Sequence, residues 1–311
     1  MVHKHKWIEA APHERLSKAA RRALGSRLDL VAHYLPRAAE SDAPEPVHQL
    51  RVSTRRAWVA LECYREILPP KAGDWMRKQL KRIRKAAGGA RDLDVLAARL
   101  RGETPHDGAS WQALLSQIED RRQQARKPVV ELWQRLASKH FRRRIRELVH
   151  GVRWRRACHG SDEPSFAEAA RDHMREVSDA FFSASSGDLS DIRVLHEFRI
   201  LGKRLRYAME LNHSAFGPEF RDKLYPQVEE VQEKIGATID HATAIDRFED
   251  WLAHGDDPRL RAPLERLLAD ERAALAANRD AFGQWWTEER AKQFQGQFDD
   301  ALTQPFAERV A

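Results

Sequence analysis

The feature that most restricts the fold is a basic phrase that occurs twice in the chain. Residues 47–58 read VHQLRVSTRRAW, and residues 195–206 read LHEFRILGKRLR, 148 positions later. Each copy has a histidine, an arginine three positions on, and two adjacent cations seven and eight positions on. A constant offset of this kind indicates an internal duplication. We therefore expect two similar modules.

The residues around each copy follow the period of an amphipathic helix. Apolar residues of the first copy recur at spacings of 7, 4, 3 and 4, so they line one face and leave the cations on the other. The predicted buried positions are Leu50, Ala57, Leu61, Tyr64 and Leu68 and, at the same offset, Phe198, Leu205, Met209, Asn212 and Phe216.

The repeat continues beyond the basic phrase. Residues 80–94, LKRIRKAAGGARDLD, align without a gap on residues 228–242, VEEVQEKIGATIDHA, at the same offset. Gly88 matches Gly236, and Asp92 matches Asp240.

The segment Arg91-Asp92-Leu93-Asp94 resembles an acidic metal-binding pair at first sight. Residues two apart on a helix do not share a face, so Asp92 and Asp94 are poorly placed to hold one metal ion. A helix cap or a buried Arg–Asp pair is the expected role.

Glycine and proline gather at a few points of the chain, and the stretches between them are rich in helix-forming residues. The breaks lie at 35–46, 68–74, 101–108, 160–164, 216–220 and 254–258. No stretch alternates polar and apolar residues as a half-buried strand does. We predict an all-α fold of two four-helix bundles around a basic central cavity or groove.

Charge is distributed unevenly between the two predicted modules. Residues 1–156 hold 35 Lys and Arg against 17 Asp and Glu, a net charge of +18. Residues 157–311 hold 19 against 30, a net charge of −11, although 193–206 is basic. A segment at +18 favours an anionic partner, which leaves nucleic acid, polyphosphate, a membrane surface or the acidic second module as alternatives.

Several function classes find no support in the sequence. No apolar run is long enough to cross a bilayer, and the N-terminus has no apolar signal segment. Cys63 and Cys158 lack the spacing of a zinc site, and neither HExxH nor a P-loop occurs. We therefore predict a soluble, non-exported cytoplasmic protein that uses no cofactor or metal.

The basic stripes differ from an ordinary solvated helix face, which mixes charges of both signs. No acid lies between Glu45 and Glu62, so the cations of the first phrase have no partner on their own helix. Two later stretches, 77–85 and 139–146, are also basic and free of acids. Guanidinium binds two phosphate oxygens at once, so an arginine stripe offers successive contacts along a linear polyanion.

The pattern HxxRVxxRR, followed by LxxIRxxxGxARDLDV and a second degenerate copy HEFRxxxKRLRY, resembles the CHAD family, the conserved histidine α-helical domain. The resemblance covers most of the chain. It implies a pair of four-helix bundles that bind inorganic polyphosphate in a basic cavity or groove, and association with polyphosphate granules. The CYTH triphosphatase often fused to this family carries a Glu-x-Glu-x-Lys strand, which is absent here.

The resemblance also implies polyphosphate-binding positions. They are His48, Arg51, Arg55, Arg56, Lys81, Arg84, Lys85, Arg142, Arg143, Arg144, His196, Arg199, Lys203, Arg204 and Arg206. Two departures from the pattern predict an asymmetric site dominated by the first module and by 195–206. Trp58 stands where the second copy has Arg206, and the segment 228–236 is acidic where the first module is basic. The two histidines are equally compatible with ligand contact and with a structural role.

Two alternatives to polyphosphate binding remain. A nucleic-acid-binding protein would use the same basic surface, but base-reading residues such as Asn or Gln are scarce in the stripes. A polyphosphate-degrading enzyme would need clustered carboxylates for Mg²⁺, and Asp92, Asp94 and Asp240 keep that class open. We predict a binding protein without catalytic residues. Granule-associated proteins remain open as partners, and the sequence leaves the oligomeric state undetermined.

Overall fold

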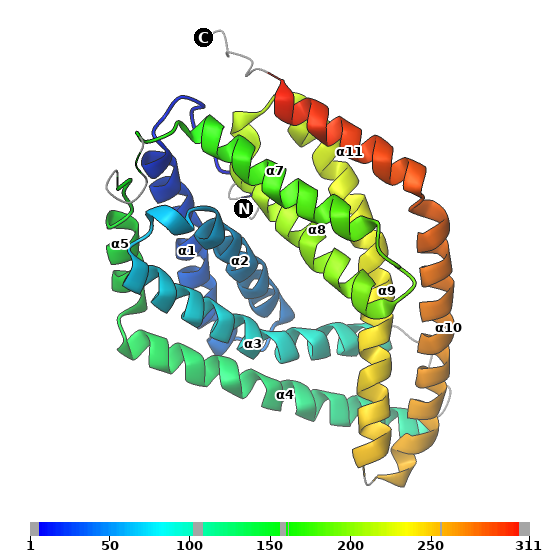
Figure 1. Ribbon diagram of the computed structural model, residues 1–311. Coiled ribbons are helices and arrows are strands. Elements are labelled where there is room, and N and C mark those ends of the chain that lie inside the picture. The colour runs from blue at the N-terminus through cyan, green and yellow to red at the C-terminus, as the bar shows by residue number, and fades with distance from the viewer. Residues whose placement is uncertain (1–5, 102–107, 156–159, 161, 256, 305–311) are drawn as a thin grey trace. The chain divides into compact units, whose positions relative to one another are not determined.

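The computed structural model describes residues 6–101, 108–155, 160, 162–255 and 257–304, and every regular element in these ranges is helical (Figure 1). The first α-helices are α1 (Leu16–Glu40), α2 (Pro44–Cys63), α3 (Pro70–Arg101), α4 (Gly108–Ser138) and α5 (Phe141–His150). They are followed by α7 (Phe166–Ser185), α8 (Ile192–Asn212), α9 (Tyr225–His254), α10 (Arg261–Trp285) and α11 (Glu288–Thr303). Short elements are η2 (Arg65–Ile67), η3 (His213–Ala215), η4 (Phe220–Leu224) and η5 (Pro258–Leu260). The predicted all-α class is confirmed.

The described residues belong to two compact units. Unit 1 comprises those within Met1–Glu103 and Leu115–Ala169, and unit 2 comprises those within Thr104–Leu114 and Ala170–Ala311. The predicted module boundary between residues 156 and 157 lies outside the described residues, as does Cys158.

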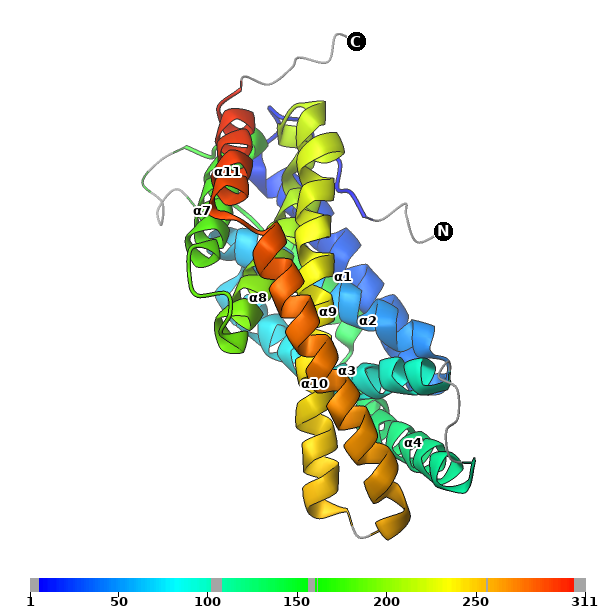
Figure 2. The same ribbon diagram turned by 90° about the vertical axis from the view of Figure 1, so that its right-hand side faces the viewer.

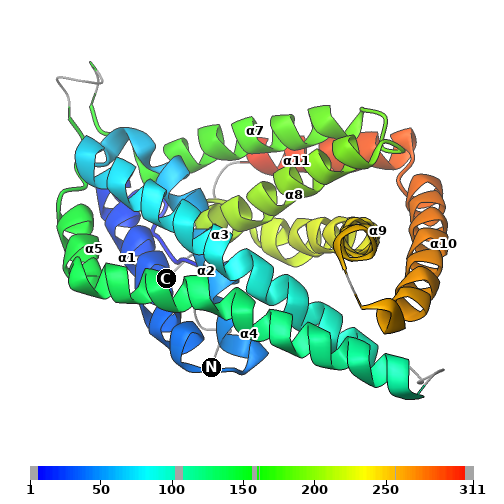
Figure 3. The same cartoon turned by 90° about the horizontal axis from the view of Figure 1, so that it is seen from below.

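Unit 1 is built around α1 and α2, which pack against each other. Helix α2 also packs on α3, and α5 packs on both α1 and α3 (Figure 1). In Figure 3, α4 runs along α3, and the ion pair of Arg101 with Glu119, at 2.8 Å, joins the two helices. All five apolar positions predicted around the first phrase, from Leu50 to Leu68, are at most 3% exposed. The first three of them lie on one face of α2, and Tyr64 and Leu68 follow the end of that helix.

Unit 2 contains a long hairpin of α9 and α10, which lie side by side (Figure 2). Helix α8 packs on α9, and an aromatic cluster joins α7, α8 and α11. Phe181 of α7 stacks on Phe198 of α8 with ring centroids 4.7 Å apart, and Phe182 meets Phe294 of α11 edge to face at 5.5 Å. Aromatic pairs of this kind stabilise a core beyond the area that they bury.

The buried positions predicted for the second copy are confirmed with one exception. Phe198, Leu205, Met209 and Asn212 are at most 1% exposed, whereas Phe216 is only half-buried. Asn212 is tolerated in the core because its Nδ2 donates to the Ala208 carbonyl at 2.9 Å and contacts His173 Nδ1 at 3.1 Å.

The predicted helical stretches 109–150 and 258–306 are each interrupted. His140, in a left-handed conformation with φ of 54°, separates α4 from α5. Thr287 separates α10 from α11, because its Oγ1 accepts a hydrogen bond from the Arg290 amide and caps α11. None of the helices in the described ranges combines the length and apolar character required to cross a membrane.

Candidate functional site

Helices α2 and α3 are joined by an arginine of the first basic phrase. Arg51 Nη1 donates to the Gly88 carbonyl at 2.8 Å and to Asp92 Oδ1 at 3.0 Å. The Arg51 side chain is 19% exposed, so most of it is buried in this contact. An Arg–Asp pair therefore forms, although Asp92 stays partly exposed and not buried as predicted. The alternative of a cap after Gly88-Gly89 does not form, because α3 continues to Arg101.

A second contact joins α2 and α3 nearer to the C-terminal end of α2. The Arg84 guanidinium of α3 lies over the Trp58 ring of α2, 5.6 Å from its centroid. Arg55 lies between these two contacts on α2, one turn from Arg51 and about one turn from Trp58. Lys81 and Lys85 follow the same face of α3 at helical spacing and are exposed. We call Arg51, Arg55, Lys81, Arg84 and Lys85 the α2–α3 face.

The α2–α3 face carries an excess of positive charge. Four of its five cations, all except Arg51, have no acidic partner within the described part of the chain. Arg56, at the edge of the predicted stripe, is half-buried and makes contacts of its own.

His48 begins the first phrase and is half-buried on α2. Burial lowers the pKa of its imidazole, and the neighbouring Arg91 lowers it further. Partial burial and the cations Arg199 and Lys203 likewise lower the pKa of His196 on α8. Both imidazoles therefore gain a proton at a lower pH than an unperturbed histidine does.

The second phrase repeats the arginine contact. Arg199 Nη2 of α8 donates to Asp240 Oδ1 of α9 at 3.0 Å, and the Arg199 side chain is again 19% exposed. Gly236 lies beside this arginine as Gly88 lies beside Arg51. All three positions are offset by 148 residues from their counterparts in unit 1.

The charges around the repeated contact are different. Glu229 and Glu233 of α9 occupy the positions of Lys81 and Lys85, and Gln232 occupies that of Arg84. Arg206 stands in the place of Trp58, and its Nη1 is 3.6 Å from Glu229. We call Arg199, Lys203, Arg206, Glu229, Glu233 and Asp240 the α8–α9 face. Its three cations are matched by three acids, so its excess charge is zero.

Arg204 is directed to another helix. Its Nη2 donates to Glu176 Oε1 of α7 at 2.9 Å. His173 lies close to this ion pair, and its pKa is lowered to about 4 by burial and then by Arg204.

The His173 shift predicts a dependence of stability on pH. The unfolded chain has a histidine pKa near 6.5, so between pH 6.5 and about 4 it binds protons that the folded chain does not. The free energy of unfolding should therefore fall as the pH drops through this window, by up to about 3 kcal/mol. Urea titrations at pH 7 and pH 5 check this, and His173→Gln should flatten the difference. An unchanged pH slope in that variant contradicts the assignment.

The three arginines predicted on α5 are separated by the structure. Arg142 donates to the Ala32 carbonyl of α1 at 3.0 Å, and Arg143 pairs with Glu147 at 2.8 Å. Arg144 lies over the Trp75 ring, 4.6 Å from its centroid. Consecutive helical residues point about 100° apart, so these cations make different contacts and form no common stripe.

Asp94 has a different role from Asp92. Its carboxylate is buried and accepts from Arg122 Nε at 2.9 Å and from Arg122 Nη2 at 2.7 Å. Arg126 Nη2 lies 3.4 Å from the same oxygen. Asp92 and Asp94 thus bind arginines of different helices, as expected for residues on different faces. Within the described residues, no group of three or more His, Cys, Asp and Glu is arranged to hold a metal ion.

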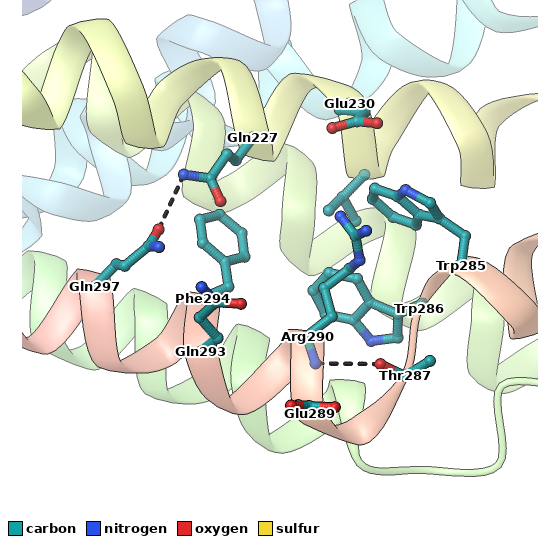
Figure 4. Close-up of a pocket in the computed structure, with 11 residues that line it drawn as sticks. Gln227, Glu230, Trp285, Trp286, Thr287, Glu289, Arg290, Gln293, Phe294 and Gln297 are labelled. Carbon is teal, nitrogen blue, oxygen red and sulfur yellow. Dashed lines mark hydrogen bonds between the residues drawn. The ribbon is translucent and has the colours of Figure 1, made fainter.

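Unit 2 also contains a pocket of about 320 Å³ between α9 and the corner of α10 and α11 (Figure 4). Trp285 and Trp286 form its aromatic wall, and Arg290 lies 4.5 Å from the Trp285 ring centroid. Glu230 and Glu289 face the same space. These two carboxylates repel phosphate, so the pocket is a poorer anion site than the α2–α3 face.

Sequence reasoning predicted an Arg–Asp pair in the segment that contains Asp92, but it missed which cations of the predicted site have acidic partners. Asp92, Glu176, Glu229 and Asp240 each bind a predicted site residue. The gap-free alignment contained one signal of this, because it matched Asp92 with Asp240 beside the matched glycines.

The described residues are all-helical, and the helix pair that carries unpaired cations in unit 1 recurs in unit 2, 148 positions later, with altered charges. The family model of the CHAD domain matches residues 22–249, which are most of the chain, and the protein therefore belongs to this family.

Two solved structures and one curated protein are similar to this chain. The crystal structure of the CHAD domain from the plant Ricinus communis matches with a TM-score of 0.72 and 20% identity, over 96% of this chain and 97% of that one. PptA from Streptomyces chartreusis matches with a TM-score of 0.60 and 18% identity, over 90% and 100%. An uncharacterized protein of Mycobacterium tuberculosis is 28% identical over 180 residues, which are 55% of this chain and 35% of that protein.

Proposed function

We propose that this protein binds inorganic polyphosphate, chiefly through the α2–α3 face. The observation that carries the proposal is the set of four cations, Arg55, Lys81, Arg84 and Lys85, without acidic partners in the described residues. They follow one face of two antiparallel helices whose positions are fixed by Arg51 and Trp58. A linear polyphosphate carries about one negative charge per phosphate group, so neighbouring phosphates can bind successive cations of this face.

The second phrase supports a secondary role for unit 2. Its arginines keep the same backbone register, but acids of α9 and α7 neutralise them. We infer that the two phrases descend from a duplicated four-helix module, of which the first copy retains the excess charge.

The proposal assigns a binding role without catalysis. Polyphosphate hydrolysis would need carboxylates that share a metal ion, whereas Asp94 is engaged with Arg122 and Asp92 with Arg51. Binding of a long polyanion in the cytoplasm would place the protein on polyphosphate granules, where it would act as an anchor or targeting module and meet other granule proteins.

Binding of labelled long-chain polyphosphate at physiological salt tests the proposal. We expect the affinity to fall roughly 50-fold between 50 and 200 mM salt, taking four phosphate contacts and the salt slope of single-stranded polyanions. Affinity should also rise with chain length, because a longer polyanion reaches more of the cations.

Competition decides between ligands. Long polyphosphate should displace the label at least about tenfold better than duplex DNA or RNA, a difference of about 1.4 kcal/mol. Equal or better competition by nucleic acid would favour the alternative function and overturn the proposal.

A further inference from the structure

Two aspartates occupy equivalent places on the two faces. Asp92 accepts from Arg51 at 3.0 Å, and Asp240 accepts from Arg199 at 3.0 Å. Each aspartate follows its adjacent glycine by four positions, so it lies one helical turn further along the same face. The cations Lys81, Arg84 and Lys85 are replaced by Glu229, Gln232 and Glu233, whereas this ion pair is present in both copies.

The aspartate is the more exposed partner in each pair. The Asp92 and Asp240 side chains are 39% and 62% exposed, against 19% for each arginine. A ligand that approaches from solvent therefore meets the carboxylate before it can reach the guanidinium. Phosphate oxygens and carboxylate oxygens accept from the same N–H groups, so they compete for them.

The electrostatic surroundings of Arg51 explain why a counter-ion is present. Burial lowers the pKa of Arg51, Arg55 and Arg91 lower it too, and Asp92 opposes them. Without an anion nearby, the Arg51 guanidinium would be repelled by these cations, at a modest cost because the pair is partly exposed to solvent.

We propose that Asp92 and Asp240 are built-in counter-ions of the two faces, which a bound polyanion displaces from Arg51 and Arg199. The inference rests on the proposed function of the α2–α3 face. It makes the two aspartates specificity-determining residues. A single phosphate that binds Arg51 only replaces the Asp92 carboxylate by another anion. A long polyphosphate chain also forms new contacts with Arg55, Lys81, Arg84 and Lys85.

The test is Asp92→Asn, which keeps an oxygen acceptor for Arg51 and removes the charge. We expect the affinity for long-chain polyphosphate to rise about three- to tenfold, because one repelling charge near the ligand is lost. Asp240→Asn should raise the affinity less, because Glu229 and Glu233 remain on its face. Because Asp240 is more exposed, Asp240→Asn tests the counter-ion role even if Asp92→Asn folds poorly. Thermal melts of both variants establish whether they are folded.

The matched control is Asp120→Asn on α4, an exposed aspartate of unit 1 outside the α2–α3 face. It makes the same change of net charge and should alter the affinity less than about twofold. Affinity in folded Asp92→Asn and Asp240→Asn that equals or falls below the wild type overturns the counter-ion role.

Heparin, a second polyanion, separates this inference from the proposed function. Wild-type protein that binds heparin but not polyphosphate would refute the proposed function, and the Asp92→Asn effect on heparin affinity would still decide the counter-ion role. Wild-type protein that binds neither polyanion would overturn both.

Discussion

Replacing Arg55 and Arg84 together by glutamate is expected to weaken polyphosphate binding by about 100-fold or more, equivalent to about 2.7 kcal/mol. Each substitution removes one phosphate contact and places a like charge beside the ligand. Neither Arg55 nor Arg84 has an acidic partner in the described residues. Because Arg84 also lies over the Trp58 ring, a thermal melt establishes that the double variant is folded. Fluorescence titration with labelled polyphosphate measures the loss.

Arg51 is a poorer choice for charge reversal, although the sequence places it in the same stripe. A glutamate there would face Asp92 and lose the hydrogen bond to the Gly88 carbonyl. The variant would then lose stability as well as charge, and the two effects could not be separated.

The matched control for the double variant is Arg65→Glu with Lys127→Glu. Both residues are exposed in unit 1, and the pair changes the net charge by the same amount away from the α2–α3 face. We expect it to weaken binding less than about threefold at physiological salt, because screening limits distant charges. A folded Arg55→Glu/Arg84→Glu protein with wild-type affinity would refute the assignment of the site.

The sequence predicted the parts of the fold that depend on one helix at a time. The apolar period gave the buried faces of α2 and α8, and the proline and glycine positions gave most of the breaks between helices. The break at His140 was missed because neither glycine nor proline marks it.

Contacts between helices were harder to predict. Periodicity tells which side of a helix a cation lies on, but the residue opposite it depends on how the neighbouring helix is rotated and shifted. The acidic partners of Arg204 and Arg206 were therefore missed, and Arg142, Arg143 and Arg144 were grouped although they make separate contacts. A cation counted from sequence contributes to a binding face only after such partners are known.

Asp94→Ala is expected to lower the free energy of unfolding of unit 1 by about 3–5 kcal/mol, the typical cost of removing one partner of a buried ion pair. The side chains of Arg122 and Arg126 are each only 9% exposed, and the variant leaves both without this carboxylate. Urea denaturation followed by circular dichroism measures the change. A loss below about 1 kcal/mol would contradict the structural role.

Arg126 explains why the effect should spread beyond α3 and α4. Its guanidinium also donates to the carbonyls of Ser41, Asp42 and Ala43, which connect α1 to α2. Without Asp94, the arginine that holds this connection loses its counter-ion, so the start of the helix that carries Arg51 and Arg55 should loosen. Asp92→Ala is the control, because its carboxylate is partly exposed and should cost about 1 kcal/mol or less.

We therefore expect opposite phenotypes from substitutions at the two aspartates of Arg91-Asp92-Leu93-Asp94, although they lie only two residues apart. Removing the charge of Asp92 should strengthen ligand binding with little loss of stability, whereas removing Asp94 should destabilise unit 1 strongly and affect binding only indirectly. The difference follows from the helix, which turns Asp92 to the cationic face and Asp94 to the buried arginines of α4. If both variants lost stability equally, the separation of a binding face from a structural core in α3 would be wrong.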